Sequence, residues 1–202
     1  MIGGEAEPED EPAEGDPKYS FRPALMGSPW EFRLAPDALV WQRGRFQGRT
    51  GYDQIRRIRL AYRPATIQNH RFVTEIWPRS GFRLLIASTS WRSIMEQARQ
   101  DAAYSDFIGE LNRRIGAAGG NTKFIAGSPP VLFWAGVVVF VASTLGLAAL
   151  TVRALQAEER AAAALIGGFL VLFLWQLGQF LRRNRPRRYR PDSIPRDLLP
   201  NA

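Results

Sequence analysis

The sequence has no cysteine, a single histidine (His70) and only two lysines, Lys18 and Lys123. The absence of cysteine excludes disulfides, thiol catalysis and cysteine-ligated zinc or iron–sulfur clusters. Metal sites and proton-transfer sites often use several histidines, so a single histidine argues against both. We therefore expect no metal and no cofactor in this chain.

Two long stretches have no charged residue. Val131–Val152 spans 22 residues and Ala161–Leu181 spans 21. A helix needs about 20 residues to cross a hydrocarbon core of roughly 30 Å, and a helix satisfies its own backbone in lipid. A buried hairpin in a soluble protein is the alternative, but its helices would normally carry a polar stripe. The pattern predicts a transmembrane hairpin with a connector at residues 153–160.

Basic residues concentrate on one side of this hairpin. The connector holds Arg153 and Arg160 against two glutamates, whereas six arginines follow the second run. These are Arg182, Arg183, Arg185, Arg187, Arg188 and Arg190. The side richer in arginine and lysine faces the cytoplasm. We expect residues 182–202 to form a basic cytoplasmic tail, with the connector outside and both termini cytoplasmic.

The first 18 residues are rich in acid, proline and glycine. Seven acidic residues and no basic one lie in residues 1–16. Such a segment buries too little apolar surface to offset its ordering entropy, so we expect it to be disordered. It is either a solvated tail or an electrostatic cover for the basic part of the chain.

Residues 19–120 alternate between apolar and polar positions and then change to a helical period. The expected strands are Trp30–Ala35, Ala38–Gly44, 45–52, Ile55–Tyr62, Arg71–Trp77 and Gly81–Ser88. Short strands at this spacing predict a small antiparallel sandwich or partly open barrel. A helix, or two abutting ones, is expected over Ser93–Ala117. Its apolar stripe is Tyr104, Phe107, Ile108, Leu111 and Ile115. The fold class is therefore α+β, with residues 121–130 as a link to the membrane.

Several phrases resemble the pleckstrin-homology-like (PH-like) domains of bacterial membrane proteins. Phe32–Leu39 has the pattern F-x-L-x-x-D-x-L, and Tyr52–Ile55 has Y-x-x-I before an arginine-bearing strand. The phrase YSDFIGELNRRI (Tyr104–Ile115) resembles their closing helix. The resemblance covers about residues 19–117 and implies strands followed by one capping helix. In many such relatives the hydrophobic pair precedes the domain, whereas here it follows.

In eukaryotic members of that family, basic residues near the first hairpin bind phosphoinositide headgroups. The resemblance makes Arg33, Arg43, Arg45 and Arg49 the nearest candidates here; a solvated face is the other reading. Arg57 and Arg59 lie on a strand with Arg56 and, together with Arg63, Arg71, Arg79 and Arg83, can form a basic side. Residues 18–122 hold 17 bases and 8 acids. This surface suits anionic lipid, an acidic protein or general solubility.

The sequence contains no recognisable catalytic motif. The glycines of Gly44–Gly51 lack the G-K-[ST] ending of a phosphate-binding loop, and no G-x-S-x-G elbow occurs. His70 lies between Asn69 and Arg71 in a polar loop. We expect neither enzymatic activity nor a small-molecule substrate, and no nucleic-acid partner, because membrane topology already explains the basic tail.

The predicted spans carry small residues at helical spacing. Ala142 precedes Gly146 by four positions, and Ala164 precedes Gly168 by four. Small residues at this spacing permit close helix approach, either within the hairpin or with a partner helix or second copy.

These features predict a membrane-anchored, non-enzymatic adaptor in a bacterial cytoplasmic membrane. It would present a basic cytoplasmic module to a protein or to anionic lipid. The alternative is a subunit or assembly factor of a larger inner-membrane complex that acts through its hairpin.

Overall fold

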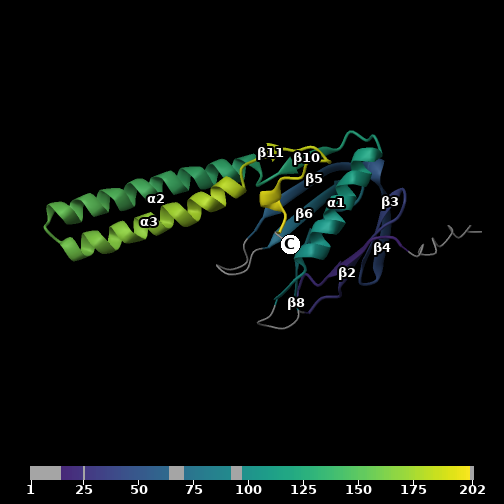
Figure 1. The fold of residues 1–202 in the computed structure, drawn as a ribbon, viewed down its shortest axis with the longest axis horizontal. Coiled ribbons are helices and arrows are strands. Elements are labelled where there is room, and N and C mark those ends of the chain that lie inside the picture. Colours follow the sequence, from purple (N-terminus) through teal and green to yellow (C-terminus); the bar gives the residue numbers. More distant parts are fainter. Residues whose placement is uncertain (1–14, 25, 64–70, 92–96, 201–202) are drawn as a thin grey trace, which may run out of the picture.

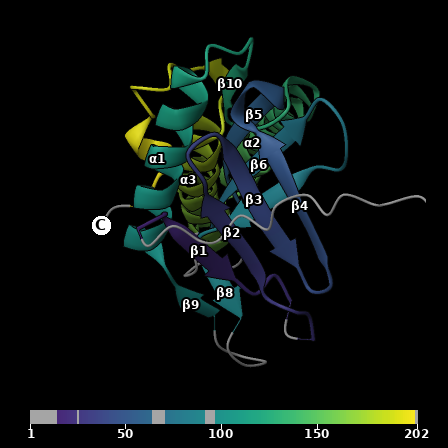
Figure 2. The same cartoon turned by 90° about the vertical axis from the view of Figure 1, so that its right-hand side faces the viewer.

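The computed structural model describes residues 15–24, 26–63, 71–91 and 97–200, and its fold confirms the α+β class. Most of the acidic N-terminal segment and His70 lie outside these residues. Four strands form sheet A, each antiparallel to its neighbour. They are β1 (Lys18–Phe21), β2 (Trp30–Leu34), β3 (Ala38–Arg43) and β4 (Phe46–Gly51). Figure 2 shows them side by side, with the long hairpin behind the domain.

Sheet B has five strands in the order β11-β10-β5-β6-β7. A 3-10 turn, Tyr52–Gln54, leads from sheet A into β5 (Ile55–Tyr62), which is followed by β6 (Phe72–Pro78) and β7 (Leu84–Ala87). These three strands are antiparallel and match the predicted strands closely. The two sheets remain separate, so the described residues contain no closed barrel.

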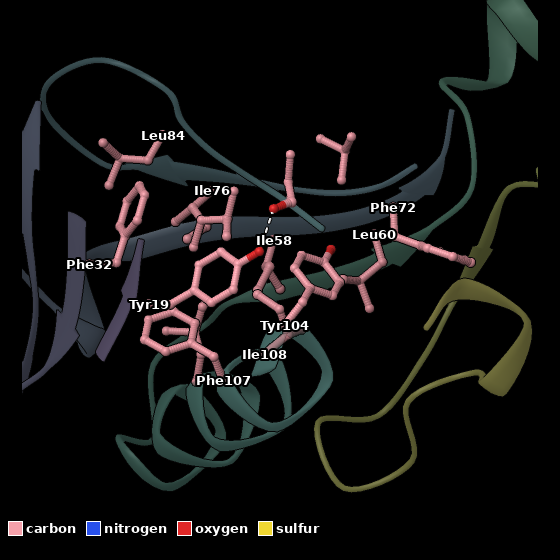
Figure 3. Packing of buried hydrophobic residues seen from close by; sticks show 14 of the residues in the cluster. Tyr19, Phe32, Ile58, Leu60, Phe72, Ile76, Leu84, Tyr104, Phe107 and Ile108 are labelled. Atoms are coloured by element: carbon pink, nitrogen blue, oxygen red, sulfur yellow. Dashed lines mark hydrogen bonds between the residues drawn. The ribbon is translucent and has the colours of Figure 1, made fainter. Parts of the chain in front are cut away.

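Helix α1 (Asp101–Ala117) packs its predicted apolar stripe against the sheets. All five residues of that stripe are buried. The Tyr19 ring centroid lies 6.0 Å from that of Tyr104 and 5.5 Å from that of Phe107, and the hydroxyls of Tyr104 and Thr74 are 2.7 Å apart. Figure 3 shows Tyr104, Phe107 and Ile108 pointing from the helix toward the side chains of sheet B.

The helix begins later than the predicted Ser93. Gln97–Arg99 forms strand β9, which pairs with β8 (Thr89–Trp91) in a two-stranded sheet. The amide of Gln100 donates to the carbonyl of Ser88 at 2.9 Å. Because these backbone groups are bonded to another strand, the helical ladder starts only at Asp101.

The expected link at residues 121–130 contains strand β10 (Lys123–Ala126), which pairs with β5 in parallel. After the hairpin, β11 (Arg187–Arg188) adds to the other side of β10. The Gly127 amide donates to the Leu60 carbonyl at 2.7 Å, and the Ser128 amide to the Asn184 carbonyl at 3.0 Å. Both ends of the hairpin are thus held by the sheet of the domain.

Helices α2 (Pro130–Gln156) and α3 (Arg160–Arg183) form the predicted hairpin, which extends away from the domain (Figure 1). Both are long and apolar enough to cross a membrane. Large apolar side chains such as Leu132, Val138, Leu165 and Val171 are exposed on its surface. An apolar surface of this extent is suited to lipid.

The segment after α3 packs on the domain. The Tyr189 hydroxyl donates to Asn112 Oδ1 of α1 at 2.8 Å, and burial raises the pKa of Tyr189 well above its usual value. The 3-10 turn Arg196–Leu198 places Leu198 in the core. The Pro200 carbonyl accepts a hydrogen bond from Ser105 Oγ at 3.3 Å. These contacts hold the C-terminal segment against α1 and the hydrophobic core.

The junction between β10 and α2 depends on a glycine. Gly127 has a φ of 85°, and a Cβ there would lie 2.6 Å from the Asn184 carbonyl oxygen and still closer to that of Arg185. Gly119 has a φ of 67° with open space around it. We expect Gly119→Ala to lower the free energy of unfolding by about 1 kcal/mol and Gly127→Ala by about 3 kcal/mol or more. Thermal unfolding of the full chain in detergent tests this; equal shifts would mean that the junction is not tightly held.

Candidate functional site: the basic face of sheet B

The strand alternation of sheet B sends one set of side chains into the core and the other outward. Ile58, Leu60 and Ile76 are fully buried on the core side. On the opposite side, Arg57 pairs in register with Trp77, and Arg59 with Glu75. The same rows continue through Lys123 and Ile125 of β10 to Arg188 of β11. We call this outward surface the basic face. Its cations are Arg57, Arg59, Arg63, Arg71, Arg83, Lys123 and Arg188.

Glu75 is the only acidic residue on the basic face among the described residues, and its side chain is fully buried. Its Oε1 lies 2.8 Å from an Arg63 nitrogen and 3.4 Å from one of Arg83, and its Oε2 lies 3.7 Å from Arg59. One carboxylate therefore organises three guanidinium groups. Because it neutralises only one charge, the face keeps a large positive excess.

Trp77 contacts two of these arginines, Arg59 and Arg83, and also Arg57. The guanidinium carbons of Arg57, Arg59 and Arg83 lie 5.5, 5.0 and 5.9 Å from its ring centroid. Such cation–π contacts hold the groups in place without neutralising them. Burial lowers the pKa of Arg59; Glu75 opposes this, and Arg57, Arg63 and Arg83 add to it. Burial also lowers the pKa of Arg71, with a further contribution from Arg63. Arginine stays charged at neutral pH, so this mutual repulsion favours an anionic ligand.

The four candidates on sheet A do not join this face. Arg33 pairs with Asp16 at 3.0 Å, and Arg49 donates to Asp37. At the turn between β3 and β4, Arg43 lies 4.9 Å from the ring centroid of Trp30, and Arg45 lies 5.5 Å from that of Phe46. The six predicted binding arginines are therefore divided between the two sheets, and of the six only Arg57 and Arg59 lie on the basic face.

The predicted interface arginines lie around the end of the hairpin. Arg182 and Arg183 end α3, Arg185 follows it, and Arg187 and Arg188 form β11. Arg187 is bonded to Asp197, and Arg190 bridges to Ser193 through the backbone. The cluster thus belongs partly to the domain, because β11 carries two of its members into sheet B.

The small residues predicted for helix packing lie on the outside of the hairpin. Ala142, Gly146, Ala164 and Gly168 are exposed, and a Cβ at either glycine would contact nothing within 4 Å. Inside the hairpin, Gly136 faces Leu181, Gly167 faces Thr151, and the rings of Phe140 and Phe173 stack at 5.6 Å. The sequence offers Gly167 and Gly168 as neighbours, and only the rotation of α3 decides which one faces α2.

Sequence reasoning missed four members of the basic face: Glu75, Trp77, Lys123 and Arg188. Alternation in Arg71–Trp77 places Glu75 and Trp77 on one side and was sufficient to find them. Lys123 and Arg188 join only through β10 and β11, which carry no clear strand pattern.

The described residues contain no group of three metal-ligating side chains. No protein family matches this chain, and neither does any curated protein or solved structure.

The buried carboxylate gives a test of how the basic face is held. Glu75→Gln leaves Arg59, which is only 8 % exposed, without its counter-charge. Removal of one partner from a buried ion pair typically costs about 3 kcal/mol or more. We expect the free energy of unfolding, measured with urea on the full chain in detergent, to fall by that amount. The control Glu31→Gln, at an exposed position on β2, should change stability by less than about 0.5 kcal/mol; equal stability of the two variants would contradict the role of Glu75.

Proposed function

We propose that this chain is a membrane-anchored, non-enzymatic adaptor whose basic face binds an acidic segment of a partner protein. The observation that carries the proposal is a face of seven cations on sheet B with one buried carboxylate, Glu75, which holds Arg59, Arg63 and Arg83 beside Trp77. Guanidinium groups held in fixed positions favour carboxylate ligands, because little side-chain entropy remains to be lost on binding.

The geometry favours a protein over lipid for the outer part of this face. Strand β5 ends at the hairpin, where Arg183 lies 5.2 Å from the Tyr62 ring centroid. Arg63 is therefore close to the membrane, whereas Arg57 lies six residues farther back, roughly 20 Å along the strand. Fields from headgroups are screened over about 8–10 Å at physiological salt. Arg57 and Lys123, which pair in register across β5 and β10, lie beyond that range, and a protein ligand reaches them.

We propose further that residues 19–117 form a PH-like domain of the bacterial membrane-associated type. Support comes from the order of elements: four strands in sheet A, three antiparallel strands in sheet B, and a C-terminal helix that packs on both. The small β8–β9 sheet and the added strands β10 and β11 depart from that simple order. Of these, β10 and β11 join the domain to its membrane anchor.

The proposed location is a bacterial inner membrane, with the domain and both termini in the cytoplasm. The arginines around the end of α3 support this orientation. Because the chain has no cysteine, single cysteines report topology without background. We expect Gln156→Cys to react with a membrane-impermeant maleimide in intact cells, and Ser193→Cys to react only after lysis. The reverse pattern would place the domain outside the cytoplasm and contradict the adaptor proposal.

The alternative function is a subunit or assembly factor of a larger membrane complex that acts through the hairpin. One observation favours it: Gly146 and Gly168 face outward, where a second helix can approach closely. Under this alternative the basic face would serve only solubility.

A pair of matched variants separates the two functions. Arg57→Gln/Arg83→Gln removes two cations from the basic face, and Arg43→Gln/Arg45→Gln removes two ring-stacked cations from sheet A. After cross-linking in native membranes and purification of the full chain, we expect the first variant to lose its companion protein by about tenfold or more, which is 1.4 kcal/mol. The sheet A variant should stay within about twofold of the unchanged protein.

Two results would contradict the adaptor proposal. One is equal loss of the companion in both arginine variants, which would indicate unspecific attraction. The other is retention by the basic-face variant together with loss in Gly146→Leu/Gly168→Leu, which would assign the interaction to the hairpin.

A further inference from the structure

A hollow lies where α3 ends and the C-terminal segment returns to the domain. Its volume is about 320 Å³. Its lining includes Phe72, Arg99, Arg183, Arg196, Asp197 and Leu199. Phe72 points toward the α1 side of sheet B and belongs to the hydrophobic core, so the hollow and the basic face are on opposite sides of the sheet. Ligand pockets in proteins span roughly 300–1,000 Å³, and this hollow is at the small end of that range.

Some charged side chains around the hollow have an ion-pair partner and others do not. Arg99 pairs with Asp101, and Asp197 pairs with Arg187. Among the described residues, no carboxylate lies within 4.0 Å of Arg183 or Arg196. Arg183 rests on the Tyr62 ring, a contact that leaves its charge in place. Two guanidinium groups therefore border the hollow with their charge unneutralised, a pattern that suits phosphate oxygens.

Arg183, the last residue of α3, fixes the level of the hollow relative to the proposed membrane. Ala161–Leu181 carries no charge, so Arg182 and Arg183 mark the boundary between hydrocarbon and headgroups. Phosphate groups of the inner leaflet lie at this level. We infer that the hollow binds the phosphodiester of an anionic phospholipid, with Arg183 and Arg196 as its ligands.

Charge and lining narrow the class of headgroup. Two free guanidinium groups beside one paired carboxylate match a headgroup with a single negative charge better than a polyphosphorylated one. Phe72 and Leu199 provide an apolar floor suited to the glycerol backbone. The inference rests on the membrane anchor of the proposed function and is independent of the basic face.

Native mass spectrometry of the delipidated full chain in detergent tests the site, with phosphatidylglycerol as probe and phosphatidylcholine as reference. We expect one phosphatidylglycerol to be retained, and Arg183→Gln/Arg196→Gln to weaken that retention by about tenfold or more. The control Arg182→Gln/Arg185→Gln removes the same charge at the same membrane level from two exposed side chains outside the hollow. It should stay within about twofold of the unchanged protein.

Arg183→Lys/Arg196→Lys keeps the charge and should retain more lipid than the glutamine pair, and an unchanged melting temperature shows that each variant is folded. The inference is overturned by equal loss in the hollow and control pairs, by equal retention of phosphatidylcholine, or by displacement of the lipid by excess inorganic phosphate. Arg57→Gln/Arg83→Gln should keep the lipid, so failure of this site and failure of the adaptor function give different results.

Discussion

The hydrogen bonding of β10 to β5 is the constraint on which the rest of the structure depends. Only Gly127, Ser128 and Pro129 separate β10 from α2. The Gly127 amide donates to the Leu60 carbonyl, and the Ser128 amide donates to the Asn184 carbonyl. A chain paired in this way cannot rotate about a flexible linker, because rotation would leave backbone donors and acceptors unpaired. The hairpin of α2 and α3 and sheet B therefore share one orientation. In the proposed membrane arrangement, the level of each residue of β5 and β6 above the lipid follows from its place along the strand.

This shared orientation gives the two sides of sheet B different environments. On the outward side, Glu75 and Trp77 hold several arginines at fixed positions. In the proposed membrane arrangement, the far end of the strands lies beyond the screened field of the lipid. On the α1 side, the returning C-terminal segment brings Arg196 to the level of Arg183. A protein ligand suits the first arrangement and a headgroup suits the second. Both follow from the same anchoring geometry rather than from the overall excess of basic residues.

Local patterns were sufficient to predict most of the regular structure. Alternation located β2 to β7, whereas the short strand β1 was not predicted. The helical stripe of Tyr104 to Ile115 located the buried face of α1. The two apolar runs located α2 and α3. Local patterns did not predict which strands pair when they lie far apart in the sequence. Strands β10 and β11 have four and two residues, too few for a periodic signal, and exist because β5 offers an open edge. The late start of α1 likewise depends on the bonds of β9 to β8, and the buried position of Leu198 depends on the return of the tail.

Because contacts between distant segments could not be predicted, the sequence alone did not show which arginines have an acidic partner. Arg33 and Arg49 are of the same residue type as Arg183 and Arg196, yet the first two have an aspartate beside them and the second two border a hollow without one. Arg59 is nearly buried and acts through its position beside Glu75, whereas Arg83 is half exposed and more available to a ligand. What a basic residue can bind depends on the charge left after its own neighbours are counted. That remainder is a property of the folded chain, because the acids that decide it come from other strands.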